Sequence, residues 1–169
     1  MPFMKYLTLL VLAAASLAWA QKVDMEFDET VNFATFKTFR IMDGNLKAKA
    51  ALLNNELTRK KIENEIRARL TVKKLTEVTT GRPDLAVRYN LGAVQRTEKD
   101  VIRGPRGRVV GTTKSQSAEG VLTIDLLDGN SRELLWRAVV VDNERDPAKI
   151  QGKLDEMVKK AFDKYPPKK

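Results

Sequence analysis

The chain has 169 residues, with 31 lysines and arginines against 22 acidic residues and a formal net charge of +9. It contains no cysteine and no histidine. This composition excludes thiolate nucleophiles, disulfide bonds, a lipid attached through an N-terminal cysteine, and the common zinc and haem sites. A chain of this length buries enough surface to fold as one domain without a metal or a disulfide. We therefore expect a single domain over residues 21–169, with no metal and no cofactor.

The first twenty residues have the three parts of an export signal. Lys5 gives a positively charged start, an apolar run follows over residues 6–17, and Ala18 and Ala20 are the small residues that a signal peptidase recognises. The apolar run is shorter than the roughly 20 residues that span a membrane. We predict a signal peptide over residues 1–20, cleavage after Ala20, and a soluble mature protein that is periplasmic or secreted.

The first half of the mature chain predicts two strands and a helix. Apolar and polar residues alternate over residues 22–27, as in a half-buried strand. Residues 31–41 carry aromatic side chains that predict a loop anchored in the core, followed by a short strand. A helical pattern then runs from Asn55 to Lys73, with Asn55 as its N-cap. Its predicted apolar stripe consists of Leu57, Ile62, Ile66 and Leu70.

The second half predicts further strands and a second helix. Alternation predicts a strand over residues 85–91, and the polar stretch 95–117, with a turn at 104–107, predicts a two-stranded ribbon. Residues 120–128 and 133–141 predict a hairpin whose even-numbered residues face the helices. Asp125 and Arg137 then share the opposite face, within reach of each other. Asp146, followed by Pro147, predicts the start of a second amphipathic helix.

Together these elements predict an α+β fold. Each helix has one apolar stripe, so each must cover a sheet face or the other helix. The expected architecture is a single domain in which a mostly antiparallel mixed sheet is packed by two amphipathic helices. A basic β-ribbon protrudes from it.

Five short phrases of the sequence occur together in a known family. They are FKTF at 36–39, PDLAVRY at 83–89, GVLTIDL at 120–126, LWRA at 135–138 and YPP at 165–167. With these phrases in order over nearly all of the mature chain, the sequence resembles the bacterial envelope family catalogued as domain of unknown function 4136. The resemblance implies export, in many members as lipoproteins, and implies no activity, cofactor or catalytic residue. Because this chain has no cysteine after its leader, we expect it to be free of a lipid anchor.

The predicted ribbon is strongly basic. Residues 82–114 contain eight lysines and arginines against three acids. Guanidinium groups suit phosphate and carboxylate partners, so this stretch is a candidate surface for an anionic lipid, lipopolysaccharide or an acidic protein. A solvated hairpin whose charge discourages edge pairing explains the same composition. Nucleic acid is not expected, because aromatic residues for base stacking are missing. The candidate residues are Arg96, Lys99, Arg103, Arg106, Arg108 and Lys114.

Other charged patterns have plainer explanations. The basic face of the first helix suits an anionic membrane, but a solvated helix face accounts for it. The acidic alternations at 24–28 and 142–146 suggest calcium, but the glycine of the calcium-loop pattern is missing and Asp146 is explained as a helix cap. A hydrolase with a carboxylate or Ser–Lys site stays the weakest alternative, because neither G-x-S-x-G nor S-x-x-K occurs. We expect no catalytic residues. The sequence favours an exported cell-envelope protein that is a non-catalytic binding or structural module.

Overall fold

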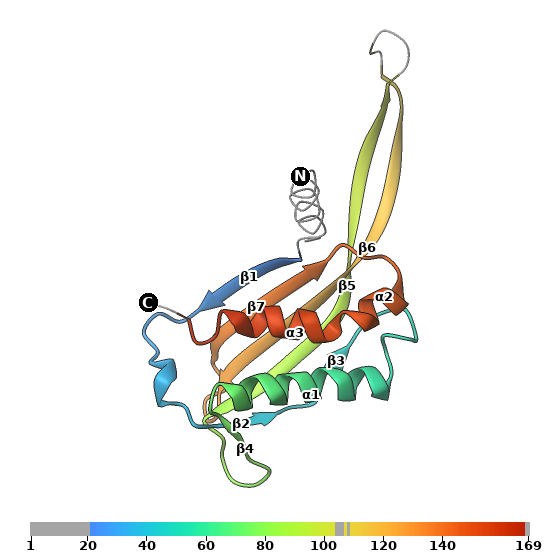
Figure 1. Ribbon diagram of the computed structural model, residues 1–169. Helices are drawn as coiled ribbons and strands as arrows, with labels where there is room; N and C mark the ends of the chain where they lie inside the picture. Colours follow the sequence, from blue (N-terminus) through green and yellow to red (C-terminus); the bar gives the residue numbers. More distant parts are fainter. Residues whose placement is uncertain (1–20, 104–106, 108, 168–169) are drawn as a thin grey trace, which may run out of the picture.

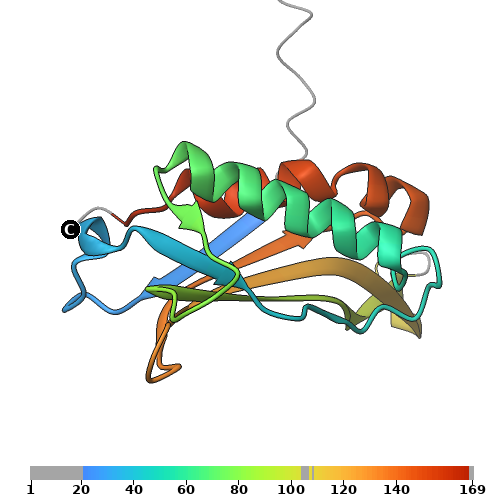
Figure 2. The same cartoon turned by 90° about the horizontal axis from the view of Figure 1, so that it is seen from below.

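The computed structural model describes residues 21–103, 107 and 109–167, with side chains described outside the stretch 93–119. Its strands form one seven-stranded mixed sheet, and helices cover one face of that sheet (Figures 1 and 2). The strands are β1 (Lys22–Phe27), β2 (Thr38–Ile41), β3 (Asn45–Leu46), β4 (Thr76–Glu77), β5 (Leu85–Arg103), β6 (Val109–Asp128) and β7 (Leu134–Asp142). The helices are η2 (Phe33–Thr35), α1 (Glu56–Val72), α2 (Pro147–Gly152) and α3 (Leu154–Asp163).

The sheet order is β1-β7-β6-β5-β2-β4, with β3 also paired to β5. The strands β1, β7, β6 and β5 pair antiparallel with one another, whereas β2 and β3 pair in parallel with β5, and β4 pairs in parallel with β2. This confirms the predicted α+β class and the mostly antiparallel mixed sheet. We call the sheet surface opposite the helices the open face, since no helix of the described chain lies on it (Figure 2).

Both predicted helix starts are confirmed by their caps. The side chain of Asn55 accepts a hydrogen bond from the amide of Thr58 at 2.9 Å, and that of Asp146 accepts from the amide of Ala148 at 2.9 Å. Each bond satisfies one of the amides that the first turn of a helix leaves without a partner. The second predicted helix is divided into α2 and α3, because Lys153 is the C-cap of α2 and the N-cap of α3.

The predicted apolar stripe of α1 was wrong at its first position. Leu57 is 76 % exposed, and Thr58 is the buried residue instead. Thr58 lies four residues before Ile62, so it occupies the same row of the helix surface, whereas Leu57 is rotated out of that row. Burial of the threonine hydroxyl is compensated by its hydrogen bond to the carbonyl of Leu52, at 2.9 Å.

The core lies between the helix layer and the sheet. Trp136 at its centre is fully buried and stacks on Phe162 of α3, with ring centroids 5.6 Å apart. Tyr165 meets the same indole edge-on at 5.7 Å. Large buried aromatic side chains contribute roughly 1.5–3 kcal/mol each relative to exposure. These contacts hold the C-terminal helix on the sheet.

The even-numbered positions of the β6–β7 hairpin lie under the helices as predicted, except at one end. Leu126 pairs with Trp136, but Leu127 pairs with Leu134, so the register shifts between them. This bulge leaves Leu134 39 % exposed and buries Leu135 in its place. The extra residue reverses the side-chain alternation locally.

The predicted ribbon is present in the backbone. β7 pairs with β6 only from Gly120 onward, and β3 pairs with β5 only as far as Leu91. Within the described backbone, the segment 93–103 pairs only with β6, and the segment 109–119 pairs only with β5. We call these two segments the ribbon; they project beyond the helix layer (Figure 1).

No helix in the described ranges is long and apolar enough to cross a membrane.

Candidate functional site

Four of the six predicted anion-binding residues lie on the ribbon. Arg96, Lys99, Arg103 and Lys114 are residues of β5 and β6, and their backbone positions are described. Their side chains belong to the stretch that the structure leaves undescribed. Arg106 and Arg108 lie outside the described residues altogether.

The ribbon register sets two of these cations opposite each other. Lys99 is the cross-strand partner of Lys114, while Arg96 is the partner of Ser117.

A second polar cluster lies at the centre of the open face. Asp125 of β6 is fully buried, with 1 % of its side chain exposed, between Arg88 of β5 and Arg137 of β7. Arg137 donates through Nε at 2.7 Å and through Nη2 at 3.0 Å, and Arg88 donates through Nη2 at 2.9 Å. The predicted proximity of Asp125 and Arg137 is confirmed.

The two arginines keep the Asp125 carboxyl group ionised. Burial acts to raise the pKa of Asp125, but hydrogen bonds and charges from Arg137 and Arg88 outweigh it and hold the pKa below its ordinary value. A carboxylate held in this state is a poor proton donor near neutral pH. The arrangement therefore supplies ion pairing across three strands.

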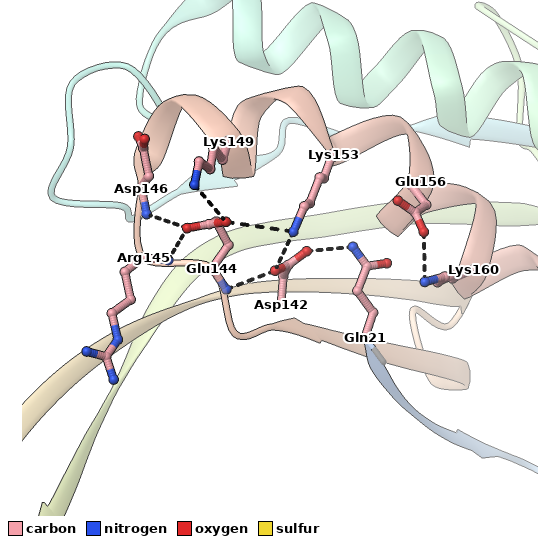
Figure 3. Close-up of polar contacts among 9 residues, drawn as sticks. All are labelled: Gln21, Asp142, Glu144, Arg145, Asp146, Lys149, Lys153, Glu156 and Lys160. Carbon is pink, nitrogen blue, oxygen red and sulfur yellow. Dashed lines mark hydrogen bonds and ion pairs between the residues drawn. The ribbon is translucent and has the colours of Figure 1, made fainter. Parts of the chain in front are cut away.

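A third cluster lines an open hollow of about 500 Å³ where β7 leads into α2. The buried Asp142 carboxylate accepts from Nε2 of Gln21 at 2.6 Å and from Nζ of Lys153 at 3.3 Å (Figure 3). The backbone amide of Glu144 also donates to it at 2.9 Å. Burial acts to raise the pKa of Asp142, yet these donors bring it below the usual range.

The carboxylates of the acidic alternation at 142–146 thus form hydrogen bonds within the chain. The Glu144 carboxylate accepts from the amides of Arg145 and Asp146, at 3.0 and 3.2 Å (Figure 3). The side chain of Asp146 caps α2. Across the described ranges, no group of three or more acidic side chains is arranged to hold a metal ion.

The phrases noted in the sequence meet in space. Arg88, Asp125 and Arg137 come from three of them. The first two phrases join at Asp84, whose Oδ2 accepts from the amides of Lys37 and Thr38 at 2.8 and 2.9 Å. Residues 23–167 match the family described as "Domain of unknown function (DUF4136)".

The chain belongs to this DUF4136 family. A comparison with curated protein sequences gave no match.

Among solved structures, a PDZ domain protein from Parabacteroides distasonis is similar, with 17 % identity and a TM-score of 0.61. The match covers 87 % of the DUF4136 chain and 36 % of that protein, so the chain spans little more than a third of its length. At this identity the likeness shows the fold alone.

Two weaker likenesses carry no functional argument. A PelC dodecamer from Paraburkholderia phytofirmans has 8 % identity and a TM-score of 0.49, over 85 % of this chain and 96 % of that one. A neuraminyllactose-binding hemagglutinin homolog from Helicobacter pylori has 8 % identity and a TM-score of 0.43, over 79 % and 84 %.

Sequence reasoning missed two contacts of this DUF4136 domain. Arg88 is one of the basic residues of 82–114, but it belongs to the Asp125 cluster. The alternation over residues 85–91 predicts which face of the sheet Arg88 occupies, but it does not predict Asp125 as the partner of Arg88. The contact of Gln21 with Asp142 joins residues 121 positions apart and has no local signal.

Proposed function

We propose that this DUF4136 chain is an exported cell-envelope protein, periplasmic or secreted after cleavage behind Ala20, and that it acts by binding and not by catalysis. The export signal at residues 1–20, which lie outside the described residues, motivates the first half of this proposal. The family match is consistent with it but carries no activity of its own.

The ribbon supports the proposal that the protein acts by binding. Two-stranded segments that pair only with each other gain little stability on their own, and this one projects beyond the helix layer (Figure 1). A binding role accounts for an extended element that the core does not need. The partner is an anionic envelope surface, because residues 93–119 contain six lysines and arginines against three acidic residues.

Three acids of the described chain are unsuited to act as general acids in a hydrolase. The pKa values of Asp84, Asp125 and Asp142 are all lowered by hydrogen bonds or ion pairs. A general acid needs a pKa near the working pH, and these three carboxyl groups are moved away from it.

Export is tested by cell fractionation and N-terminal sequencing. We expect a mature chain that begins at Gln21 outside the inner membrane. A cytoplasmic chain with residues 1–20 still attached would refute export without touching the binding proposal.

Binding is tested by sedimentation with lipid vesicles. The mature chain should sediment with vesicles that contain phosphatidylglycerol and not with pure phosphatidylcholine, and added salt should release it. The ribbon variant should lose at least about tenfold in affinity; it changes four residues to serine: Arg96, Lys99, Arg103 and Lys114.

A matched variant controls for total charge. It changes four exposed lysines outside the ribbon to serine: Lys47, Lys49, Lys60 and Lys159. We expect its affinity to stay within about threefold of the unmodified chain. Equal losses in the two variants would assign binding to net charge, and no loss in the ribbon variant would refute the ribbon as the site.

A further inference from the structure

Charged residues of alternating sign cross the open face in one row. Arg88, Asp125, Arg137 and Glu26 are successive cross-strand partners on β5, β6, β7 and β1. We call this row the charge ladder. Its order is positive, negative, positive, negative.

Three of the four side chains of the charge ladder are accessible to solvent. The side chains of Arg88 and Arg137 are 45 % and 36 % exposed, and Glu26 is exposed on the edge strand. Asp125 uses both oxygens on the arginines, but each guanidinium carries five N–H donors and retains some for a further acceptor. The described helices all pack on the other side of the sheet (Figure 2).

This sign pattern complements itself under a two-fold rotation. Consider an axis that runs along the strands, in the interface plane, between β6 and β7. It places Arg88 opposite Glu26 of the second copy and Asp125 opposite the second copy's Arg137. The two sheets then pack face to face with their strands aligned, the common arrangement of β-sandwiches.

The neighbouring rows suit the same packing. Val121 and Val141 are partners in one row, and Thr123 and Val139 in another. All four are partly exposed on the open face. The rotation sets β6 of one copy over β7 of the other, so these small residues meet beside the central Asp125–Arg137 pairs, while the outer ladder charges, Arg88 and Glu26, meet toward the rim.

We propose that the open face is a docking surface for a second copy of this chain, in a two-fold symmetric dimer that pairs Arg88 of one copy with Glu26 of the other. The axis direction sends both ribbons out at the same end of the dimer. If the ribbon binds an anionic surface as proposed above, the dimer holds that surface with two ribbons at once.

The test measures dimer dissociation of residues 21–169 by sedimentation equilibrium, from about 1 to 200 µM protein. The unmodified chain should dimerise, and more weakly at about 500 mM than at about 50 mM salt. Glu26→Arg should raise the dissociation constant at least about tenfold. Glu156→Arg, the same charge change on the helix side, should alter it less than about threefold.

The decisive measurement is the double variant Glu26→Arg with Arg88→Glu. Within one copy these residues are three strand spacings apart, about 14 Å, so they cannot form an ion pair there. In the dimer, the exchange restores opposite charges, and the dissociation constant should return to within about threefold of the unmodified value.

A further variant guards against loss of folding. Arg88→Glu sets a second acid beside Asp125, so thermal unfolding must first establish that the double variant is folded. Thr123→Lys leaves the ladder intact and puts a charge at the centre of the face; it should abolish the dimer. A monomeric unmodified chain, a dimer that tolerates Thr123→Lys, or a folded double variant without rescue would each overturn the proposal while leaving ribbon binding unaffected.

Discussion

The phenol ring of Tyr89 fills the space that a side chain at position 44 would need. A Cβ atom added to Gly44 would lie 1.8 Å from Cζ of that ring. Tyr89 is fully buried, and its hydroxyl donates to Oε1 of Glu63 at 2.8 Å, so the ring is fixed at both ends. Gly44→Ala should therefore destabilise the fold by about 1–3 kcal/mol, as other overpacking substitutions do. Chemical denaturation measures the change.

Gly92→Ala is the matched control for that substitution. A Cβ at position 92 meets nothing within 4 Å. Since alanine is favoured over glycine inside a strand by roughly 0.5–1 kcal/mol, we expect an unchanged or slightly higher free energy of unfolding. If Gly44→Ala were as stable as Gly92→Ala, Tyr89 would have to yield to the added methyl group.

Asp84 links the start of β5 to β2. Its carboxylate accepts from two backbone amides, and its own amide donates to the hydroxyl of Thr38 at 2.9 Å. Asp84→Ala leaves the amides of Lys37 and Thr38 without this acceptor and should cost about 1–3 kcal/mol of stability. Asp24→Ala, which removes only an exposed ion pair with Lys22, should cost less than about 1 kcal/mol. Denaturation midpoints of the two variants that coincide would contradict this role.

Asp125 should contribute to the acid sensitivity of the fold. Its pKa in the folded chain lies below the ordinary value of about 3.9 that it regains on unfolding. Its stabilising contribution is therefore complete above that ordinary pKa and is lost as the pH falls through the folded pKa. Asp125→Asn should be less stable than the unmodified chain at neutral pH.

The same substitution should make the acid limb of the stability curve shallower. Thermal melting between about pH 5 and pH 2 measures this slope. A variant whose melting temperature falls as steeply with acid as that of the unmodified chain would show that Asp125 is not a source of the pH dependence.

The ribbon should be the least protected part of the sheet. Its amides are held only by the facing strand, whereas residues 85–91 and 120–126 are flanked by further strands and covered by helices. Hydrogen exchange should therefore be faster for residues 93–103 and 109–119 than for the body of β5 and β6. Uniform protection along both strands would contradict the view that the ribbon adds nothing to the cooperative core.

Local patterns predicted a good deal of this fold. Alternation gave β1 with both ends correct, because its apolar residues face the helices and its polar ones do not. Asn55 and Asp146 were recognised as caps because their side-chain chemistry acts within three residues. Asp125 and Arg137 could be paired from parity alone, since a hairpin fixes which residues face the same way.

Features that depend on distant contacts could not be predicted. Hydropathy favoured burial of Leu57 over burial of Thr58. The buried row of the helix is instead the one that contains Ile62, and the Thr58 hydroxyl in that row is satisfied by its hydrogen bond to the carbonyl of Leu52. The bulge that exchanges Leu134 for Leu135 leaves no trace in the alternation. The order of β5 beside β6, which brings Arg88 to Asp125, follows from topology and not from either strand's sequence.

The place of β1 beside β7 has a consequence for how the chain is made. Lys22 pairs with Val141, so the first strand to be synthesised waits for a partner that comes almost at the end. Before β7 is made, β1 has no strand to pair with, and its apolar residues Val23, Met25 and Phe27 lack the packing that they have in the folded chain. A translation product that stops before residue 134 would retain two unpaired strand edges, and exposed edges of this kind are templates for aggregation. Synthesis of β7 provides the strand that joins β1 to β6 and so completes the sheet.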